Sequence, residues 1–358
     1  MNLSIFQKPS RYINHEINII HKEAPVKVAL VFPDIYEIGM SHLGLRILYK
    51  IINDIPYAAA ERVFAPWNDF RNYLKENSLP LSSLESKRPL KDFDIIGFSL
   101  QYELSYTTVL DILNLGNIPF KTEERLSLNY PLVIAGGPCT VNPLPLSPFI
   151  DAFLVGDGEE AILEITNTYN RWKKEGDSRK ESLLKKLSGI EGIYVPLFQN
   201  ENLLTNNNPV SFSVKRRFVK SLDSVPYPDN PIVPYTSIVH DRVNIEVSRG
   251  CSMGCRFCQA GMIYRPVRER SPQQVLKLAE NSLKNTGYEE VSFTSLSAGD
   301  YSCLIEVLRE FNKRYSDKNI ALSLPSLRIA AVNREILHEI RTVKKTGFTI
   351  APEAGTDR

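Results

Sequence analysis

Three of the five cysteines in this 358-residue chain lie close together, at Cys251, Cys255 and Cys258. An extended residue spans only about 3.3–3.6 Å, so the C-x3-C-x2-C spacing lets all three thiolates reach one metal centre. Gly250 and Gly254 give the backbone the freedom that such a tight loop needs. The sequence therefore predicts a metal site on these three thiolates.

The number of ligands bears on the kind of metal. A structural zinc site takes four ligands, and the nearest spare candidates are His240 upstream and Cys303 far downstream. Iron–sulfur clusters are held by cysteine thiolates, usually four. A cubane with three protein ligands leaves one iron open, and an open coordination position is typical of a reactive metal. A zinc knuckle or three unrelated core thiols is the alternative interpretation.

This spacing, with Phe257 just before the last cysteine, resembles the radical S-adenosylmethionine (SAM) superfamily. The resemblance covers about residues 26–358 and is closest over residues 241–272, DRVNIEVSRGCSMGCRFCQAGMIYRPVRERSP. It implies a 4Fe–4S cluster whose open iron chelates the amino and carboxylate groups of SAM. The reduced cluster would cleave the sulfonium bond to give a 5′-deoxyadenosyl radical. It also implies that Phe257 contacts SAM and that a flavodoxin- or ferredoxin-type protein donates the electron.

The composition is that of an ordinary soluble globular protein, with 43% hydrophobic and 23% charged residues. A net charge of +2 gives no clear signal for nucleic-acid binding. Clustered cysteines in odd number favour a reducing compartment and metal binding over disulfides. No run approaches 18 apolar residues, and residues 1–16 lack the apolar core of a signal peptide. We therefore expect a cytoplasmic protein that does not associate with a membrane.

Repeated strand–helix units must position the cysteine loop. A strand at Val243–Val247 would present the loop at its carboxyl end, where parallel barrels carry their chemistry. Ser271-Pro272-Gln273-Gln274 is typical of a helix start, and Gly287 of a helix end. The further expected strands are 290–296, 320–324 and 348–350, and the expected helices are 272–284, 303–314 and 334–344.

The resemblance assigns SAM-binding roles to residues at these strand ends. Ser297-Ala298-Gly299-Asp300 stands where superfamily members keep a GGE-like motif that receives the methionine amino group, with Asp300 as the acid. Arg328 would pair with the methionine carboxylate. Glu353 would bind the ribose hydroxyls or the amino group. The alternative for Asp300 is a Gly-Asp turn that caps the next helix. Arg265, Arg268 and Arg270 are either structural or phosphate-binding.

Five short apolar segments before residue 160 predict an open, doubly wound domain, which binds ligands at the carboxyl ends of its strands. The expected strands are Val26–Phe32, Arg62–Phe64, Phe93–Ser99, Leu132–Ala135 and Ala152–Val155. Such a domain ahead of the cysteine loop resembles the cobalamin-binding domain of many radical SAM enzymes. That resemblance places the corrinoid's nucleotide tail against Ser99, Gly136 and Gly137. A simple turn is the alternative for the glycine pair.

Two other features of this domain do not fit a cofactor motif. The family's axial histidine lies in D-x-H-x-x-G, but His42 has Met40 and Leu45 at the Asp and Gly positions. A helix-capping or loop histidine is therefore the favoured interpretation. The Gly156-x-Gly158-x-x-Ala161 match follows the last strand and carries three carboxylates, which would repel a pyrophosphate.

The predicted fold is α/β, with a Rossmann-like domain of cobalamin-binding type followed by a partial (β/α) barrel. Residues 1–24 form an N-terminal arm, 25–175 the Rossmann-like domain, 176–238 a linker with short strands, and 239–358 the barrel. A strand is expected within the linker at Val210–Phe218. The superfamily barrel has six strands and this chain has four, so the sequence predicts a truncated barrel.

Three functions are compatible with these features. The first is a radical SAM enzyme that also uses cobalamin, for methyl transfer or a carbon rearrangement. The second is a radical SAM enzyme whose first domain docks a substrate, such as RNA or a protein. The third is a non-catalytic iron–sulfur subunit. The substrate is not identified by any residue of the sequence.

Overall fold

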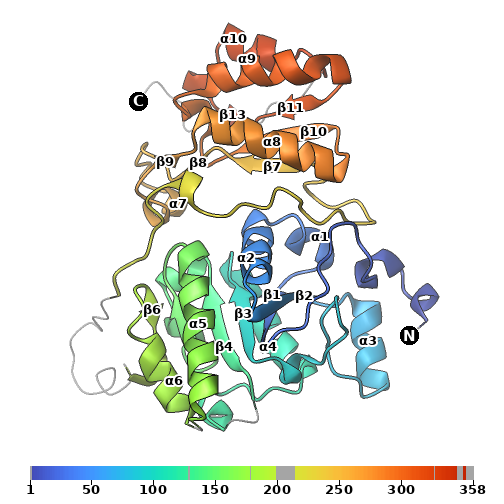
Figure 1. Ribbon diagram of the computed structural model, residues 1–358, viewed down its shortest axis with the longest axis vertical. Helices are drawn as coiled ribbons and strands as arrows, with labels where there is room; N and C mark the ends of the chain where they lie inside the picture. Colours follow the sequence, from blue (N-terminus) through green and yellow to red (C-terminus); the bar gives the residue numbers. More distant parts are fainter. Residues whose placement is uncertain are drawn as a thin grey trace. The chain divides into compact units, whose positions relative to one another are not determined.

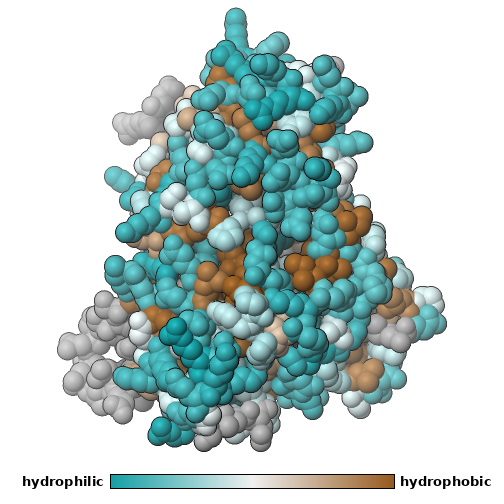
Figure 2. Space-filling view, viewed as in Figure 1, coloured by the Kyte–Doolittle hydropathy of each residue, from teal (hydrophilic) through white to brown (hydrophobic). Residues whose placement is uncertain are grey.

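The computed structural model describes residues 2–127, 130–177, 179–198, 214–325, 327–344 and 350–351. The chain divides into two compact units (Figure 1). Unit 1 comprises Met1–Val219 and Pro234–Val239, and unit 2 comprises Lys220–Val233 and His240–Arg358. No helix among the described residues is both long and apolar enough to cross a membrane. Figure 2 shows a mainly hydrophilic surface with small apolar patches.

Unit 1 is built on a six-stranded sheet with the order β2-β1-β3-β4-β5-β6. Strands β1 to β5 run parallel, and β6 is antiparallel to β5. The bounds are β1 Val26–Phe32, β2 Ala58–Phe64, β3 Ile95–Ser99, β4 Leu132–Gly136, β5 Ala152–Leu154 and β6 Ile193–Tyr194. All five predicted strands are therefore confirmed.

Helices cover both faces of this sheet, as the doubly wound prediction requires. Val31 and Ala29 of β1 belong to a core shared with Val109 and Ile112 of α4, whereas α2 and α5 contact β1 from the other face (Figure 1). Alternate strand residues point to opposite faces, so a strand buried on both sides is apolar throughout. The helices are α1 Tyr36–Gly39, α2 Leu43–Asp54, α3 Asn68–Glu76, α4 Tyr106–Leu115, α5 Glu159–Glu175 and α6 Lys180–Leu187.

The first residues of the chain are tied to the sheet by buried charges. Glu16 pairs with Arg62 of β2 at 2.5 Å, and Glu85 pairs with the same guanidinium at 2.7 Å. All three side chains are at most 2% exposed. Charges buried this deeply are stable only when they are paired, so Arg62 holds the N-terminal segment and the Glu85 loop against the edge strand.

The segment 176–238, predicted as a linker with short strands, contains a helix that was not predicted and, over its described residues, lacks the strand that was. Helix α6 lies within it. The predicted strand 210–218 is wrong where it is described: residues 214–218 form only an isolated bridge, from Arg217 to Gly156. Residues 210–213 lie outside the described residues. A side chain at Gly156 would meet the Arg217 carbonyl at 2.0 Å, so the chain's own backbone fills this glycine loop.

Unit 2 contains a three-stranded parallel sheet with the order β11-β10-β7. Its strands are β7 Val243–Glu246, β10 Glu290–Thr294 and β11 Ala321–Ser323. Two further pairs are β8 Ser248–Arg249 antiparallel to β9 Arg268–Glu269, and β12 Leu327–Arg328 parallel to β13 Ile350–Ala351. The helices are α7 Gln259–Ile263, α8 Pro272–Thr286, α9 Leu304–Tyr315 and α10 Arg334–Ile340.

The boundaries of α8 follow the predicted capping chemistry. Ser271 Oγ accepts a hydrogen bond from the Gln274 amide at 3.4 Å, and Pro272 occupies the first turn. Gly287 ends the helix in the left-handed conformation at φ 72°. The third barrel strand is shorter than predicted, because Pro325 offers no amide hydrogen to extend the ladder beyond β11.

The proline-rich segment packs along β7 rather than hanging free. The Tyr227 hydroxyl donates to the Asn244 carbonyl at 2.8 Å and accepts from the Glu246 amide at 3.0 Å. Arg270 Nη1 donates to the Leu222 carbonyl at 2.5 Å, and its guanidinium lies 4.8 Å from the Tyr227 ring centroid. The Tyr227 hydroxyl thus satisfies two backbone groups on the outer edge of β7, and Arg270 holds the proline-rich segment in place beside it.

Candidate active site

The three clustered cysteines lie in a loop whose two ends are paired. The loop leaves through β8 and returns through β9, with Ser248 opposite Glu269 and Arg249 opposite Arg268. Cys251, Cys255 and Cys258 are free and partly accessible. The Cys258 sulfur accepts a hydrogen bond from the Gly261 amide at 3.4 Å and caps α7. The β8–β9 pair, called the stem below, thus closes a short loop that carries all three thiols.

Glycines close this loop because no other residue fits. Gly250 has φ 94°, and a Cβ there would lie 2.7 Å from the Tyr264 carbonyl oxygen and 2.8 Å from that of Pro266. The Arg268 guanidinium donates to the same two carbonyls, at 3.1 and 3.0 Å. Arg268 and Arg270 therefore serve the structure of the loop stem, which decides between the two roles that the sequence left open.

The donor set fits an iron–sulfur cubane better than a single ion. No group of three His, Cys, Asp or Glu side chains in the described ranges is arranged to hold one metal ion. Each cysteine ligand of a cubane binds a different iron, so the three sulfurs need not converge on a single point. The other thiols do not belong to the loop: Cys139 is only 6% exposed in the core of unit 1, and Cys303 is the N-cap residue of α9.

Asp300 is the centre of a polar cluster at the end of β10. Its carboxylate accepts a hydrogen bond from Ser297 Oγ at 2.6 Å and from Arg328 Nε at 2.9 Å. The Arg328 guanidinium lowers the pKa of Asp300, and the Ser297 hydrogen bond adds to this effect. The carboxylate is therefore held ionised, as an acceptor for a cationic group must be.

Arg328 connects this cluster to the cysteine loop. Its pKa is raised first by the hydrogen bond to Asp300, and the Cys251 and Cys255 thiols also contribute. A Coulombic contribution falls with distance, so these two cysteines are among the charged groups that Arg328 senses. Phe257 in the same loop is 77% exposed. The structure thus brings Ser297, Asp300 and Arg328 together beside the loop, and Glu353 lies outside the described residues.

Gly299 is required by close packing rather than by backbone conformation. A Cβ at this position would lie 2.4 Å from the Ala331 Cβ and 3.1 Å from a Leu327 methyl carbon. The short helical turn Ala298–Asp300 therefore rests directly on the segment that carries Arg328. This contact sets the distance between Asp300 and its ion-pair partner.

Unit 1 has its own candidate site at the carboxyl ends of its strands. Ser99 of β3 is in register with Gly136 of β4, so the predicted residues lie together. Gly137 has φ 106°, and a Cβ would lie 2.5 Å from the Leu100 carbonyl oxygen. A Cβ on Gly136, in contrast, would meet nothing within 4 Å among the described residues. The strand order around β1 and β3 is that of a doubly wound sheet whose ligands bind at this rim.

His42 has the structural role that the sequence favoured. Its Nδ1 accepts a hydrogen bond from the Leu45 amide at 3.2 Å and caps α2. Burial lowers the pKa of His42 to about 4, and a hydrogen bond with the Gln101 side chain opposes this shift. The helix-capping interpretation is confirmed, and the capping nitrogen is not available to bind a metal.

Comparison with known proteins identifies the family. The model described as "Radical SAM proteins, N-terminal" matches residues 44–196, and the model of the radical SAM superfamily matches residues 245–358. The second match contains the three loop cysteines together with Asp300 and Arg328. The chain belongs to the radical SAM superfamily.

Among curated relatives, an uncharacterised protein of Methanocaldococcus jannaschii is 27% identical over 92% of this chain and 61% of its own length. The threonylcarbamoyladenosine tRNA methylthiotransferase MtaB of Bacillus subtilis is 28% identical over 29% of this chain and 20% of its own length. The anaerobic magnesium-protoporphyrin IX monomethyl ester cyclase of Cereibacter sphaeroides is 24% identical over 39% of this chain and 21% of its own length. The chain thus spans less than two thirds of each relative.

Two solved structures share the fold. The radical SAM methyltransferase TsrM from Kitasatospora setae, with cobalamin and a 4Fe–4S cluster bound, has a TM-score of 0.57 and 17% identity, over 92% of this chain and 61% of that one. The same enzyme with tryptophan substrate and the SAM analogue aza-SAM has a TM-score of 0.55 and 16% identity, over 91% of this chain and 59% of that one. An α/β domain with a parallel sheet followed by a radical SAM fold is therefore confirmed.

A polar layer on the sheet of unit 2 was missed at the sequence level. Asn244, Ser292 and Ser323 are in register across the three strands, and Ser292 is fully buried. Phe293, the next residue, packs against Phe311 of α9 at 5.8 Å, so the polar side chains point away from the helices. The alternation Val-Ser-Phe in β10 carried this signal. In a (β/α) barrel the strand face that points away from the helices lines the interior.

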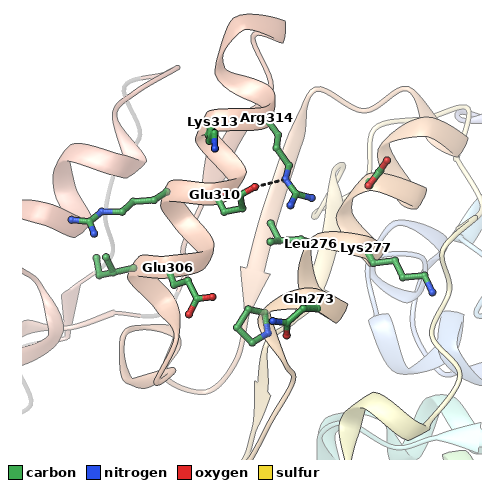
Figure 3. A pocket seen from close by; sticks show the side chains of 11 residues that line it. Gln273, Leu276, Lys277, Glu306, Glu310, Lys313 and Arg314 are labelled. Atoms are coloured by element: carbon green, nitrogen blue, oxygen red, sulfur yellow. Dashed lines mark hydrogen bonds and ion pairs between the residues drawn. The ribbon is translucent and has the colours of Figure 1, made fainter.

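A groove of about 760 Å³ lies between α8 and α9 on the helical side of unit 2 (Figure 3). Its apolar lining residues are Pro272, Leu276 and Ile305, and Glu310 pairs with Arg314 at 2.8 Å along one wall. Lys277, Lys313 and Glu280 are exposed around it. Its lining includes neither the cysteines nor Asp300 or Arg328, so this groove is not the candidate active site.

Proposed function

We propose that the chain is a radical SAM enzyme in which Cys251, Cys255 and Cys258 hold a 4Fe–4S cluster with one open iron. The observation that carries this proposal is a closed loop with three free, accessible thiols beside an ionised Asp–Arg pair. When bound and reduced, the cluster supplies the electron that cleaves the sulfonium bond of SAM and releases a 5′-deoxyadenosyl radical. A flavodoxin- or ferredoxin-type protein would deliver that electron.

The residues around the loop suit the methionine end of SAM. That end is a zwitterion, with one ammonium and one carboxylate, and Asp300 and Arg328 offer the opposite charge to each. Ser297 orients the Asp300 carboxylate, and Gly299 lets the turn approach Arg328. The exposed Phe257 ring is placed in the same loop, where it would cover SAM. Glu353 would bind the ribose hydroxyls or the amino group.

Unit 1 is proposed to bind cobalamin at the rim formed by Ser99, Gly136 and Gly137. Support comes from the strand order, from the open space over Gly136, and from the shared fold with TsrM, whose structure contains cobalamin. We expect no protein histidine on cobalt; His42 in particular caps α2 through Nδ1, and its ring also has a hydrogen bond with the Gln101 side chain. Methyl transfer or a carbon rearrangement is the reaction class that these two cofactors support.

The cluster assignment is tested by anaerobic reconstitution and by quantification of iron and sulfide. Cys251→Ala, Cys255→Ala and Cys258→Ala should each abolish the cluster, since each removes one of only three thiolates that would hold it. Cys139→Ala and Cys303→Ala are matched controls and should retain the iron content of the wild type. Stoichiometric zinc without iron–sulfur absorbance would contradict the assignment. Reductive release of 5′-deoxyadenosine from SAM would separate an enzyme from a non-catalytic iron–sulfur subunit.

A further inference from the structure

The stem of the cysteine loop is bonded to the residues that follow Asp300. Glu269 lies in β9, the returning strand of the stem. Its carboxylate accepts a hydrogen bond from the Ser302 amide at 2.9 Å, and the Ser302 hydroxyl donates to its second oxygen. Both carboxylate oxygens are thus directed at one residue, which lies two positions after Asp300.

A second hydrogen bond joins the neighbouring residues Tyr301 and Arg270. The Tyr301 hydroxyl donates to the Arg270 carbonyl at 2.8 Å, and Tyr301 is only 3% exposed. Two consecutive residues after Asp300 are therefore fastened to two consecutive residues of the stem. Asp300 itself is held from the other side by Ser297 and Arg328.

Helix capping alone does not account for the contact of Glu269 with Ser302. Helix α9 begins at Leu304 with Cys303 as its N-cap, and no side chain caps it. Glu269 instead joins β9 to the segment just after the turn that carries Asp300, so its contact restrains that segment relative to the cysteine loop. A carboxylate that accepts two hydrogen bonds from one residue restrains that residue in direction as well as in distance.

We propose that Glu269 is a positioning residue for SAM: by holding Ser302 it keeps the Asp300 carboxylate in register with the cysteine loop. This inference rests on the proposed function, because the ammonium that Asp300 accepts belongs to SAM bound at the open iron. The ammonium is then fixed at two points, iron and carboxylate. A displacement of either loop separates those points, and the ligand cannot satisfy both.

The test measures the dissociation constant of SAM on the anaerobically reconstituted full chain, together with iron content. Glu269→Ala should weaken SAM binding about tenfold, the loss of roughly one charged hydrogen bond, and leave the iron content unchanged. Glu269→Gln keeps an oxygen that accepts from the Ser302 amide, so it should bind SAM within about threefold of the wild type. Glu306→Ala is the matched control, since Glu306 is an exposed acid in the first turn of α9 and should bind SAM normally.

A double-variant cycle distinguishes positioning from general support. If Glu269 acts through Asp300, adding Glu269→Ala to Asp300→Ala should cost less than about twofold more. Fully multiplied losses, or normal SAM binding by Glu269→Ala, would overturn the inference. If Glu269→Ala does not fold, Ser302→Ala and Tyr301→Phe, which each remove one hydroxyl, must weaken SAM binding in its place. A wild-type protein without a cluster would overturn the proposed function as well.

Discussion

At the scale of single residues, His42 shows how local hydrogen bonds decide a role that residue type leaves open. One ring nitrogen accepts the Leu45 amide, and the Gln101 side chain is the further hydrogen-bond partner of the ring. The positive charge that protonation would add is poorly solvated at this site, which is why burial lowers the pKa of His42 to about 4. The ring is neutral in the folded state over the physiological range.

The stability of the protein should therefore depend on pH through His42. Between about pH 6.5 and pH 4 the unfolded chain takes up a proton that the folded chain does not, so stability is lost as the pH falls. His42→Asn keeps an N-cap acceptor and removes the titration. Between pH 7 and 4.5 the wild type should lose roughly 2–2.5 kcal/mol more unfolding free energy than His42→Asn. The unfolding free energies come from denaturant titrations at the two pH values, and an equal loss in the wild type and in His42→Asn would contradict this prediction.

Site residues could be predicted from the sequence where residue type and spacing together indicate a chemistry. Cys251, Cys255 and Cys258 predict a metal site, because three thiols within one short loop are rarely placed together for another purpose. Glu269 carried no such signal, because its partner Ser302 is 33 positions away and both are common surface types. The ion pair between Asp300 and Arg328 likewise could not be predicted from the sequence, although both residues were chosen as site residues for their charge.

At the scale of elements, the contact between the turn Ala298–Asp300 and the Arg328 segment can be tested by size. Gly299→Ala would force its Cβ against Ala331, at 2.4 Å, and should cost about 1–3 kcal/mol of stability. It should also weaken SAM binding, because the turn carries Asp300. Ala331→Gly removes the methyl group that Gly299→Ala strikes, so the double variant should recover most of both losses. Thermal unfolding and SAM titration measure the two effects. Failure of Ala331→Gly to rescue would show that the contact is not the constraint.

Elements were predictable where local signals agreed. Helix α8 has an N-cap serine, a first-turn proline and a terminal glycine, and its bounds follow from them. The buried strands of unit 1 were visible as apolar runs. The predictions were wrong or incomplete where contacts between residues distant in sequence determine the local structure. Arg217 forms a bridge with Gly156, 61 positions away, and the proline-rich segment contacts β7 through the Tyr227 hydroxyl. Neither contact follows from propensity or periodicity.

At the scale of the whole molecule, each proposed cofactor site is built within one unit. The cysteine loop, Asp300 and Arg328 all belong to unit 2, whereas Ser99, Gly136 and Gly137 belong to unit 1. The two sites share none of these residues. We therefore expect the cluster and the corrinoid to be lost independently, even if the reaction needs both.

Gly136→Val is the sharpest probe of the corrinoid site. A side chain at Gly136 meets no described atom within 4 Å, so the fold should tolerate valine while the ligand's space is filled. Gly137→Val is unsuitable, because its Cβ would strike the Leu100 carbonyl and destabilise the rim itself. With the full chain, Gly136→Val should weaken corrinoid binding more than about tenfold, measured by absorbance, and keep the unfolding midpoint and iron content of the wild type.

The reciprocal variant completes this experiment. Cys255→Ala should lose the cluster and bind corrinoid normally. His42→Ala should leave the spectrum of bound corrinoid unchanged, because Nδ1 caps α2 and the ring is also hydrogen-bonded to the Gln101 side chain. A spectral shift in His42→Ala would reverse the assignment of the axial position. If the wild type binds no corrinoid, the rim over Gly136 is free for another ligand, and unit 1 is better explained as a substrate-docking domain. Normal binding by Gly136→Val would instead place the corrinoid elsewhere on unit 1, because a valine at that position cannot share the space with it.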